Sequence, residues 1–184
     1  MSEHDKNTTT LNTLIATLLD SVDGYTKAGQ DIDQPELAER FNARARERQS
    51  AVAGLQAAVA SLGGNPEDDG TVLAGAHRMF LGLKEAVTGR DDQAIVNEVE
   101  RGEDDLKAKF EAARDNIDLA PEARTAVDAA WTSVKAGHDE MSQLKHTLQG
   151  YDAGRADQAA TTRQQEYASQ SSRDTRAPGS GETY

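Results

Sequence analysis

Residues 35–64 read PELAERFNARARERQSAVAGLQAAVASLGG, and this stretch decides the fold class. Its apolar side chains recur at intervals of three and four residues, which places them on one face of an α-helix. Pro35 suits a first helical turn, where a missing N–H does no harm, and Gly63-Gly64 is a typical stop signal. We therefore expect an amphipathic helix that ends at about residue 62. The residues of its apolar face are Leu37, Phe41, Ala45, Val52, Leu55, Val59 and Leu62.

The same periodicity predicts further helices along the chain, at about 8–30, 71–88, 92–116 and 121–150. The helix at 71–88 is shorter than the others and would connect two helix hairpins. A long connection of this kind lets the second hairpin enter parallel to the helix at 35–62. We therefore expect an all-α, ferritin-like four-helix bundle made of two hairpins and a short crossover helix. The alternative is an up-and-down bundle in which 71–116 is one long broken helix.

Both ends of the chain differ in composition from the middle. Residues 1–7 are polar, and we expect them to be disordered. The bundle would then occupy 8–149. Residues 150–184 contain almost no large aliphatic side chains, and such a segment cannot bury enough apolar surface to offset the entropy of ordering. We expect this segment to be a disordered tail.

Charge and composition exclude several classes of function. The formal net charge is -12, which repels phosphate backbones and argues against nucleic acid as a partner. The chain has no cysteine, which excludes disulfides, thiolate catalysis and cysteine-based metal centres. It has no apolar run of the roughly 18 residues that span a bilayer, and it has no secretory signal. We therefore expect a cytoplasmic protein that does not interact with a membrane. Phosphate-loop and nucleophile motifs are also missing, and we predict no catalytic residue.

Several polar residues lie on the apolar faces of the predicted helices when each residue is advanced by 100°. If the helices at 35–62 and 92–116 are parallel, two arginines and one glutamate fall at the same height. A histidine of the last helix and a tyrosine of the first also point inward. The expected buried polar network is Tyr25, Arg44, Arg48, Glu103 and His138.

Two hypotheses account for this layer. An arginine cannot lose its charge, so a buried Arg48 needs a carboxylate partner, for which Glu103 is placed best. The alternative is a di-metal site, with iron or manganese held by Glu100, Glu103 and His138. Ferritin-like di-iron proteins use two Glu-x-x-His motifs, but this sequence has none, since Lys135 stands three residues before His138. Two arginines would also repel a dication, so we predict no cofactor and keep the metal site as the alternative.

Four stretches carry a family resemblance. They are LNTLIATLLDSVDGY at 11–25 followed by Pro35-Glu36-Leu37, His77-Arg78, LKEAVTGRDDQAIVNEVERGED at 83–104, and VKAGHD at 134–139. Together they resemble a bacterial family of four-helix-bundle proteins of unknown function in the ferritin-like superfamily. The resemblance covers about 10–148 and implies a cytoplasmic protein associated with stress response.

From the resemblance and the residues together we expect a non-enzymatic structural or binding protein. Such a protein would form a homo-oligomer or bind a protein partner. The alternative function is that of a ferritin-like metal-binding protein or oxidase with a degenerate carboxylate and histidine site.

Overall fold

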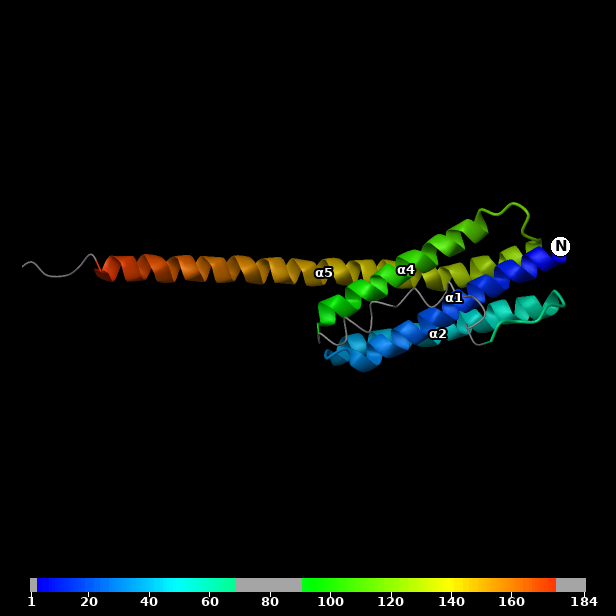
Figure 1. Ribbon diagram of the computed structural model, residues 1–184, viewed down its shortest axis with the longest axis horizontal. Helices are drawn as coiled ribbons and strands as arrows, with labels where there is room; N and C mark the ends of the chain where they lie inside the picture. The colour runs from blue at the N-terminus through cyan, green and yellow to red at the C-terminus, as the bar shows by residue number, and fades with distance from the viewer. Residues whose placement is uncertain (1–2, 69–90, 175–184) are drawn as a thin grey trace, which may run out of the picture. The chain divides into compact units, whose positions relative to one another are not determined.

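The structure is a computed structural model that describes residues 3–68 and 91–174 (Figure 1). These residues form four α-helices and no strand, which confirms the predicted all-α class. The helices are α1 (Glu3–Asp31), α2 (Pro35–Ser61), α4 (Asp92–Arg114) and α5 (Pro121–Asp174). The helix predicted at 71–88 lies outside the described residues.

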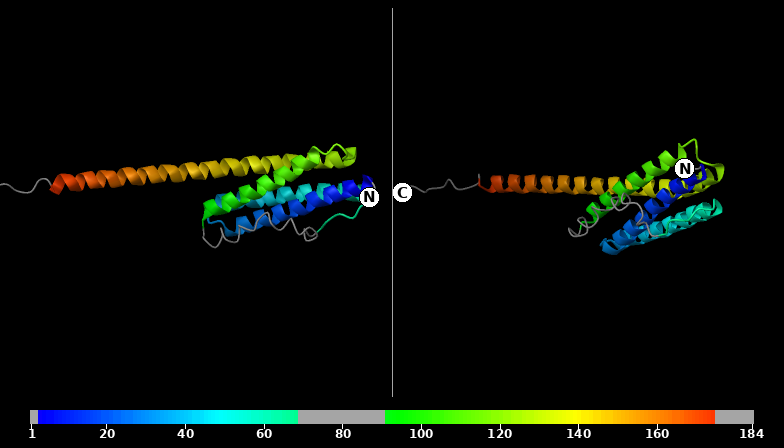
Figure 2. Two further views of the ribbon diagram at one scale, coloured as in Figure 1. Left: turned by 45° about the horizontal axis from the view of Figure 1, so that its top comes forward. Right: turned by 45° about the vertical axis from the view of Figure 1, so that its right-hand side comes forward.

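The first two helices form an antiparallel hairpin. Asn12, in the first half of α1, donates from its side-chain amide to the carbonyl of Asn65 at 2.9 Å and accepts from the N–H of Glu67 at 2.9 Å. Both of these partners follow the end of α2. The start of α1 therefore lies beside the end of α2, and Figure 2 shows the two helices side by side in both of its views.

Two further contacts fix the direction of α4. The N–H of Asp33, in the turn between α1 and α2, donates to the carboxylate of Asp92 at 2.9 Å. At the other end, the N–H of Ala120 donates to the side chain of Asn7 at 2.8 Å. The α4 helix thus starts beside the α1–α2 turn and ends beside the start of α1, so it runs parallel to α2. This is the direction expected from two hairpins joined by a long connection.

The core is built from aliphatic side chains of all four helices, with few aromatic residues. Each fully buried Leu, Ile or Val side chain contributes about 1.5–3 kcal/mol relative to an exposed one. Tyr25 and Phe41 pack together outside the main cluster, with ring centroids 5.9 Å apart. Fully buried members of the core include Leu11, Ile15 and Leu18 of α1, Val52, Leu55 and Val59 of α2, Leu106 and Phe110 of α4, and Val127 and Val134 of α5.

The helix ends agree with the sequence at α2 and differ at α1. Gly63 has a φ of 70°, and the N–H of Gly64 bonds to the carbonyl of Val59 at 3.0 Å, which is the C-terminal motif that Gly63-Gly64 predicts. The α1 helix begins at Glu3, so it includes residues that were expected to be disordered. The hydroxyl of Thr9 donates to the carbonyl four residues before it, as a residue inside a helix does.

The prediction that the last helix ends at Gly150 is wrong, because α5 continues through Gly150 to Asp174. One glycine costs a helix about 1 kcal/mol, and the Ala, Gln and Arg residues that follow are good helix formers. The chain divides into two compact units, one up to Lys145 and one from His146 onward. In the second unit every side chain from 151 to 167 is exposed, so the absence of burial that the composition predicts is seen there. Residues 175–184 of the expected tail lie outside the described part.

Candidate functional site

An ion pair between Arg48 of α2 and Glu103 of α4 lies inside the bundle. Both side chains are fully buried, with 0% of their surface exposed. The Nη2 of Arg48 donates to Oε2 of Glu103 at 2.5 Å. Charge-assisted hydrogen bonds of this length are about twice as strong as neutral ones. The predicted pairing of these two residues is therefore present in the structure.

Two serine hydroxyls complete the surroundings of the Arg48 guanidinium. Its Nη1 donates to Ser133 of α5 at 2.7 Å, and its Nε donates to Ser21 of α1 at 3.3 Å. The Ser21 hydroxyl is 3.4 Å from Oε1 of Glu103 and donates weakly to it. Ser21, Arg48, Glu103 and Ser133 are called the Arg48 layer below. Each of the four helices supplies one residue of this layer, so the layer joins all of them.

Gly137 of α5 leaves the space that the ion pair occupies. A Cβ atom built at this residue would lie 2.3 Å from Nη2 of Arg48 and 2.8 Å from Oε2 of Glu103. Real Cβ atoms do not approach this closely, so with any other residue at this place the ion pair or α5 would have to shift. The missing side chain of Gly137 thus makes room for the Arg48 layer.

Tyr25 of α1 lies next to the Arg48 layer without joining its hydrogen bonds. Its ring is fully buried, and the Arg48 guanidinium lies 5.9 Å from the ring centroid. The Tyr25 hydroxyl is buried and has no partner at ordinary hydrogen-bond geometry among the described residues, although the Glu103 carboxylate is near enough to act on it. Burial first, and the negative charge of Glu103 second, raise the pKa of the Tyr25 hydroxyl well above its ordinary value. Tyr25 therefore stays neutral and contributes mainly apolar packing.

We expect Tyr25→Phe to raise the free energy of unfolding by up to about 1 kcal/mol, because it removes a buried hydroxyl that gains no hydrogen bond. Urea denaturation followed by circular dichroism measures this change. A loss of more than about 1 kcal/mol would contradict the assignment and would show that the hydroxyl has a partner in solution.

The structure separates the remaining predicted site residues from the Arg48 layer. Arg44 donates to Glu140 of α5 at 2.6 Å and to Glu47 at 2.6 Å, and its side chain is 17% exposed. His138 lies near the surface, and Glu100 accepts from Lys145 at 2.7 Å. The structure therefore brings Arg48 and Glu103 together with Tyr25 beside them, and it places Arg44 and His138 in other contacts.

The three candidate metal ligands do not converge. Glu103 faces Arg48, Glu100 faces Lys145, and His138 faces two aspartates. In residues 3–68 and 91–174, no group of three His, Asp or Glu side chains could hold a metal ion. This arrangement of the described residues gives the di-metal alternative no support.

Sequence reasoning missed three members of the site: Ser21, Ser133 and Gly137. Val134 and Met141 of α5 are fully buried, and Gly137 lies between them at helical spacing, so their periodicity could have identified it. His138, which we expected to point inward, lies one residue, or about 100°, further around the helix than Gly137, and its side chain is 20% exposed. The two serines carry no comparable signal, because small polar residues are common on both faces of a helix.

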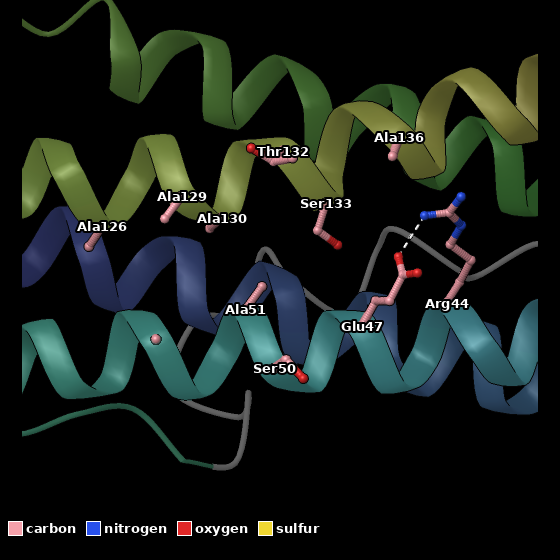
Figure 3. Close-up of a pocket in the computed structure, with 11 residues that line it drawn as sticks. Arg44, Glu47, Ser50, Ala51, Ala126, Ala129, Ala130, Thr132, Ser133 and Ala136 are labelled. Carbon is pink, nitrogen blue, oxygen red and sulfur yellow. Dashed lines mark hydrogen bonds and ion pairs between the residues drawn. The ribbon is translucent and has the colours of Figure 1, made fainter.

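A shallow groove of about 720 Å³ lies between α2 and α5 on the outside of the bundle (Figure 3). Among the described residues that line it, Arg44 and Glu47 are the charged ones, and Figure 3 shows both at one end. All its other lining residues are no larger than threonine: Ser50, Ala51, Gly54, Ala126, Ala129, Ala130, Thr132, Ser133 and Ala136. A Cβ built at Gly54 would meet nothing within 4 Å, so this wall is open. We call this surface the α2–α5 groove.

Comparison with known families matches residues 6–116 to one described as a domain of unknown function (DUF2383). The match includes α1, α2 and α4, and the chain therefore belongs to this family. The α5 helix, with Ser133 and Gly137, follows the matched region. No curated protein matches the chain significantly. None of the helices in the described part of the chain has the length and apolarity needed to cross a bilayer.

Proposed function

We propose that this member of the DUF2383 family is a non-enzymatic, ferritin-like bundle protein of the cytoplasm. Its function is to bind another protein chain. Bundle proteins place their metal and cofactor sites in the core, on side chains from facing helices. Here the Arg48 layer fills such a place with a buried ion pair. This observation carries the proposal, because the Glu103 carboxylate is already bound by an arginine that keeps its charge.

The arrangement of the helices supports the ferritin-like assignment. A bundle in which α2 and α4 are parallel needs one long connection, as ferritin-like folds have. The bacterial origin, the cytoplasmic location and the stress-associated role rest on the resemblance of the sequence stretches at 11–25, 83–104 and 134–139.

The α2–α5 groove is the surface that we assign to contact, and a second copy of the chain is the partner. Two copies with a net charge of -12 repel each other, so they can associate only through a face with little net charge. The groove meets this requirement in the described part of the chain, since the charged residues that line it there, Arg44 and Glu47, have opposite signs. Its small side chains also let a partner helix approach closely, and self-complementary contacts of this kind are the commonest in homodimers.

Ala129→Arg tests this assignment, because it places a long charged side chain in the groove. We expect the wild-type chain to elute as a dimer and the variant as a monomer in size-exclusion chromatography with light scattering, with unchanged helix content. Ala53→Arg is the matched control. Ala53 lies on α2 and is exposed, as Ala129 on α5 is, but it does not line the groove. The control should remain a dimer.

A wild-type chain that is monomeric at every concentration would overturn self-association, and equal effects of both variants would move the contact to another face. Metal analysis of the same protein, purified without chelator, tests the alternative function. Iron or manganese near one equivalent per chain would favour a metal-binding protein or oxidase and contradict the non-enzymatic proposal.

A further inference from the structure

His138 of α5 lies between two carboxylates. Its Nε2 is 3.0 Å from Oδ1 of Asp104 on α4, and its Nδ1 is 3.3 Å from Oδ1 of Asp139, the next residue of α5. The side chain of His138 is 20% exposed, whereas the side chains of Asp104 and Asp139 are 56% and 50% exposed. The contact with Asp104 links two helices, and the contact with Asp139 stays within one.

The number of protons on the imidazole decides how many of these contacts can be hydrogen bonds. A neutral imidazole has one N–H and one nitrogen lone pair, whereas a carboxylate only accepts. One of the two nitrogens must then face a carboxylate oxygen without a proton between them. The imidazolium has two N–H groups and can donate to Asp104 and Asp139 at once.

We propose that His138 is a pH-sensitive clamp that ties α5 to α4 more tightly when its imidazole is charged. The second proton turns an unfavourable lone-pair contact into a hydrogen bond and adds the attraction between opposite charges. Because the ring is held from both sides, the proton also fixes the ring orientation needed for the contact with Asp104 across the two helices.

Two lysines act on the same carboxylates. Lys135 of α5 forms an ion pair with Asp139. The hydrogen bond of Lys107 of α4 to Glu111 raises the pKa of Lys107 most, and the charges of Asp104 and Asp139 add smaller effects in the same direction. Lys135 and then His138 lower the pKa of Asp139. The Asp139 carboxylate therefore stays charged at all pH values at which imidazoles titrate. The lysines weaken the clamp by competing for its acceptors but do not remove it.

The direction of the pH effect follows from where the contact exists. Only the charged imidazole of His138 can donate to both carboxylates, and only the folded chain brings the three groups together. The contact therefore stabilises the fold at pH values at which the imidazole is charged. The stabilisation is therefore present on the acidic side of the range of about pH 5–8 in which histidines change charge, and it is lost on the alkaline side. Asp104 belongs to the region that matches the family and His138 follows it, so the clamp joins the family bundle to α5.

Thermal unfolding of His138→Gln against wild type at about pH 8 and about pH 5.5 tests the clamp. Glutamine keeps an uncharged donor, so we expect similar melting temperatures at the higher pH. At the lower pH we expect the wild type to gain about 2 °C over the variant, the size of a modest charge contact in a chain of this length. In an Asp104→Asn background this pH-dependent difference should fall by at least half. His146→Gln, an exposed histidine on the same helix, is the matched control and should show no pH-dependent difference.

Hydrogen exchange gives a second measurement. We expect the α4 segment around Asp104 to exchange more slowly at the lower pH in wild type than in His138→Gln, after correction for the intrinsic pH dependence of exchange. A melting difference that is the same at both pH values, or one that persists unchanged in Asp104→Asn, would overturn the proposal.

Discussion

Replacing Glu103 by alanine should lower the free energy of unfolding by about 3–5 kcal/mol. The substitution leaves the Arg48 guanidinium fully buried with two serine hydroxyls and no opposite charge. Arginine cannot escape this cost by losing its proton, so the chain must admit water or shift α2 outward. Chemical denaturation with circular dichroism measures the loss. A chain of this size is stable by about 5–15 kcal/mol, so a loss of this size is a large part of the total stability and the comparison is made at low temperature.

Two control substitutions separate the cost of an unpaired charge from the general cost of mutation. Asp105→Ala, on the same helix, removes an exposed ion pair with Arg101 and should cost less than about 1 kcal/mol. The double variant Arg48→Met with Glu103→Leu removes both charges, and it should recover most of the stability that Glu103→Ala loses. A loss below about 0.5 kcal/mol for Glu103→Ala, typical of surface positions, would show that the Arg48 layer is open to water.

The helical pattern of the sequence was enough to predict the positions of the four long helices. Each of these rests on large apolar side chains at regular spacing, which the burial of a helix face requires. The pairing of Arg48 with Glu103 was argued from chemistry instead, because a buried arginine needs a carboxylate, and the side chain of Glu103 is fully buried in the structure.

The same pattern could not place Arg44 and His138, for a physical reason. Both lie near the boundary of an apolar face, where a long or amphipathic side chain can pack its stem inward and turn its polar end to the surface. The polar end then goes to whichever opposite charge is near. For Arg44 this is Glu140, and for His138 it is Asp104, and both contacts depend on how two helices are set against each other. Periodicity within one helix contains no information about that setting.

The end of α5 shows a different limit. The composition after Gly150 correctly predicts that side chains will not be buried, since residues 151–167 are all exposed. It does not predict the local backbone conformation, because helix propensity acts within the chain and does not need a core. The lack of aliphatic residues therefore predicts that side chains are exposed, but it gives no information on whether the backbone is helical.

The second large effect concerns Gly137, and there the sign of the change is the test. Inside a helix, alanine is usually better than glycine by about 0.5–1 kcal/mol. At Gly137 we expect the opposite, a loss of about 1–3 kcal/mol for Gly137→Ala, because the new methyl group would overlap the Arg48 guanidinium and the Glu103 carboxylate. The guanidinium cannot move aside cheaply, since it is held by Glu103 and by two serines from other helices.

Gly54→Ala in the monomeric Ala129→Arg background is the matched control, because Gly54 lines the proposed contact surface and, within one chain, a methyl group there meets nothing within 4 Å. It should raise the free energy of unfolding by about 0.5–1 kcal/mol. In an Arg48→Met with Glu103→Leu background, the cost of Gly137→Ala should change by more than about 0.5 kcal/mol, as expected for residues in contact. If instead both glycine variants gain stability alike, α5 does not lie close over the ion pair. The Arg48 layer would then join α1, α2 and α4 through its hydrogen bonds, with α5 held by the aliphatic core alone.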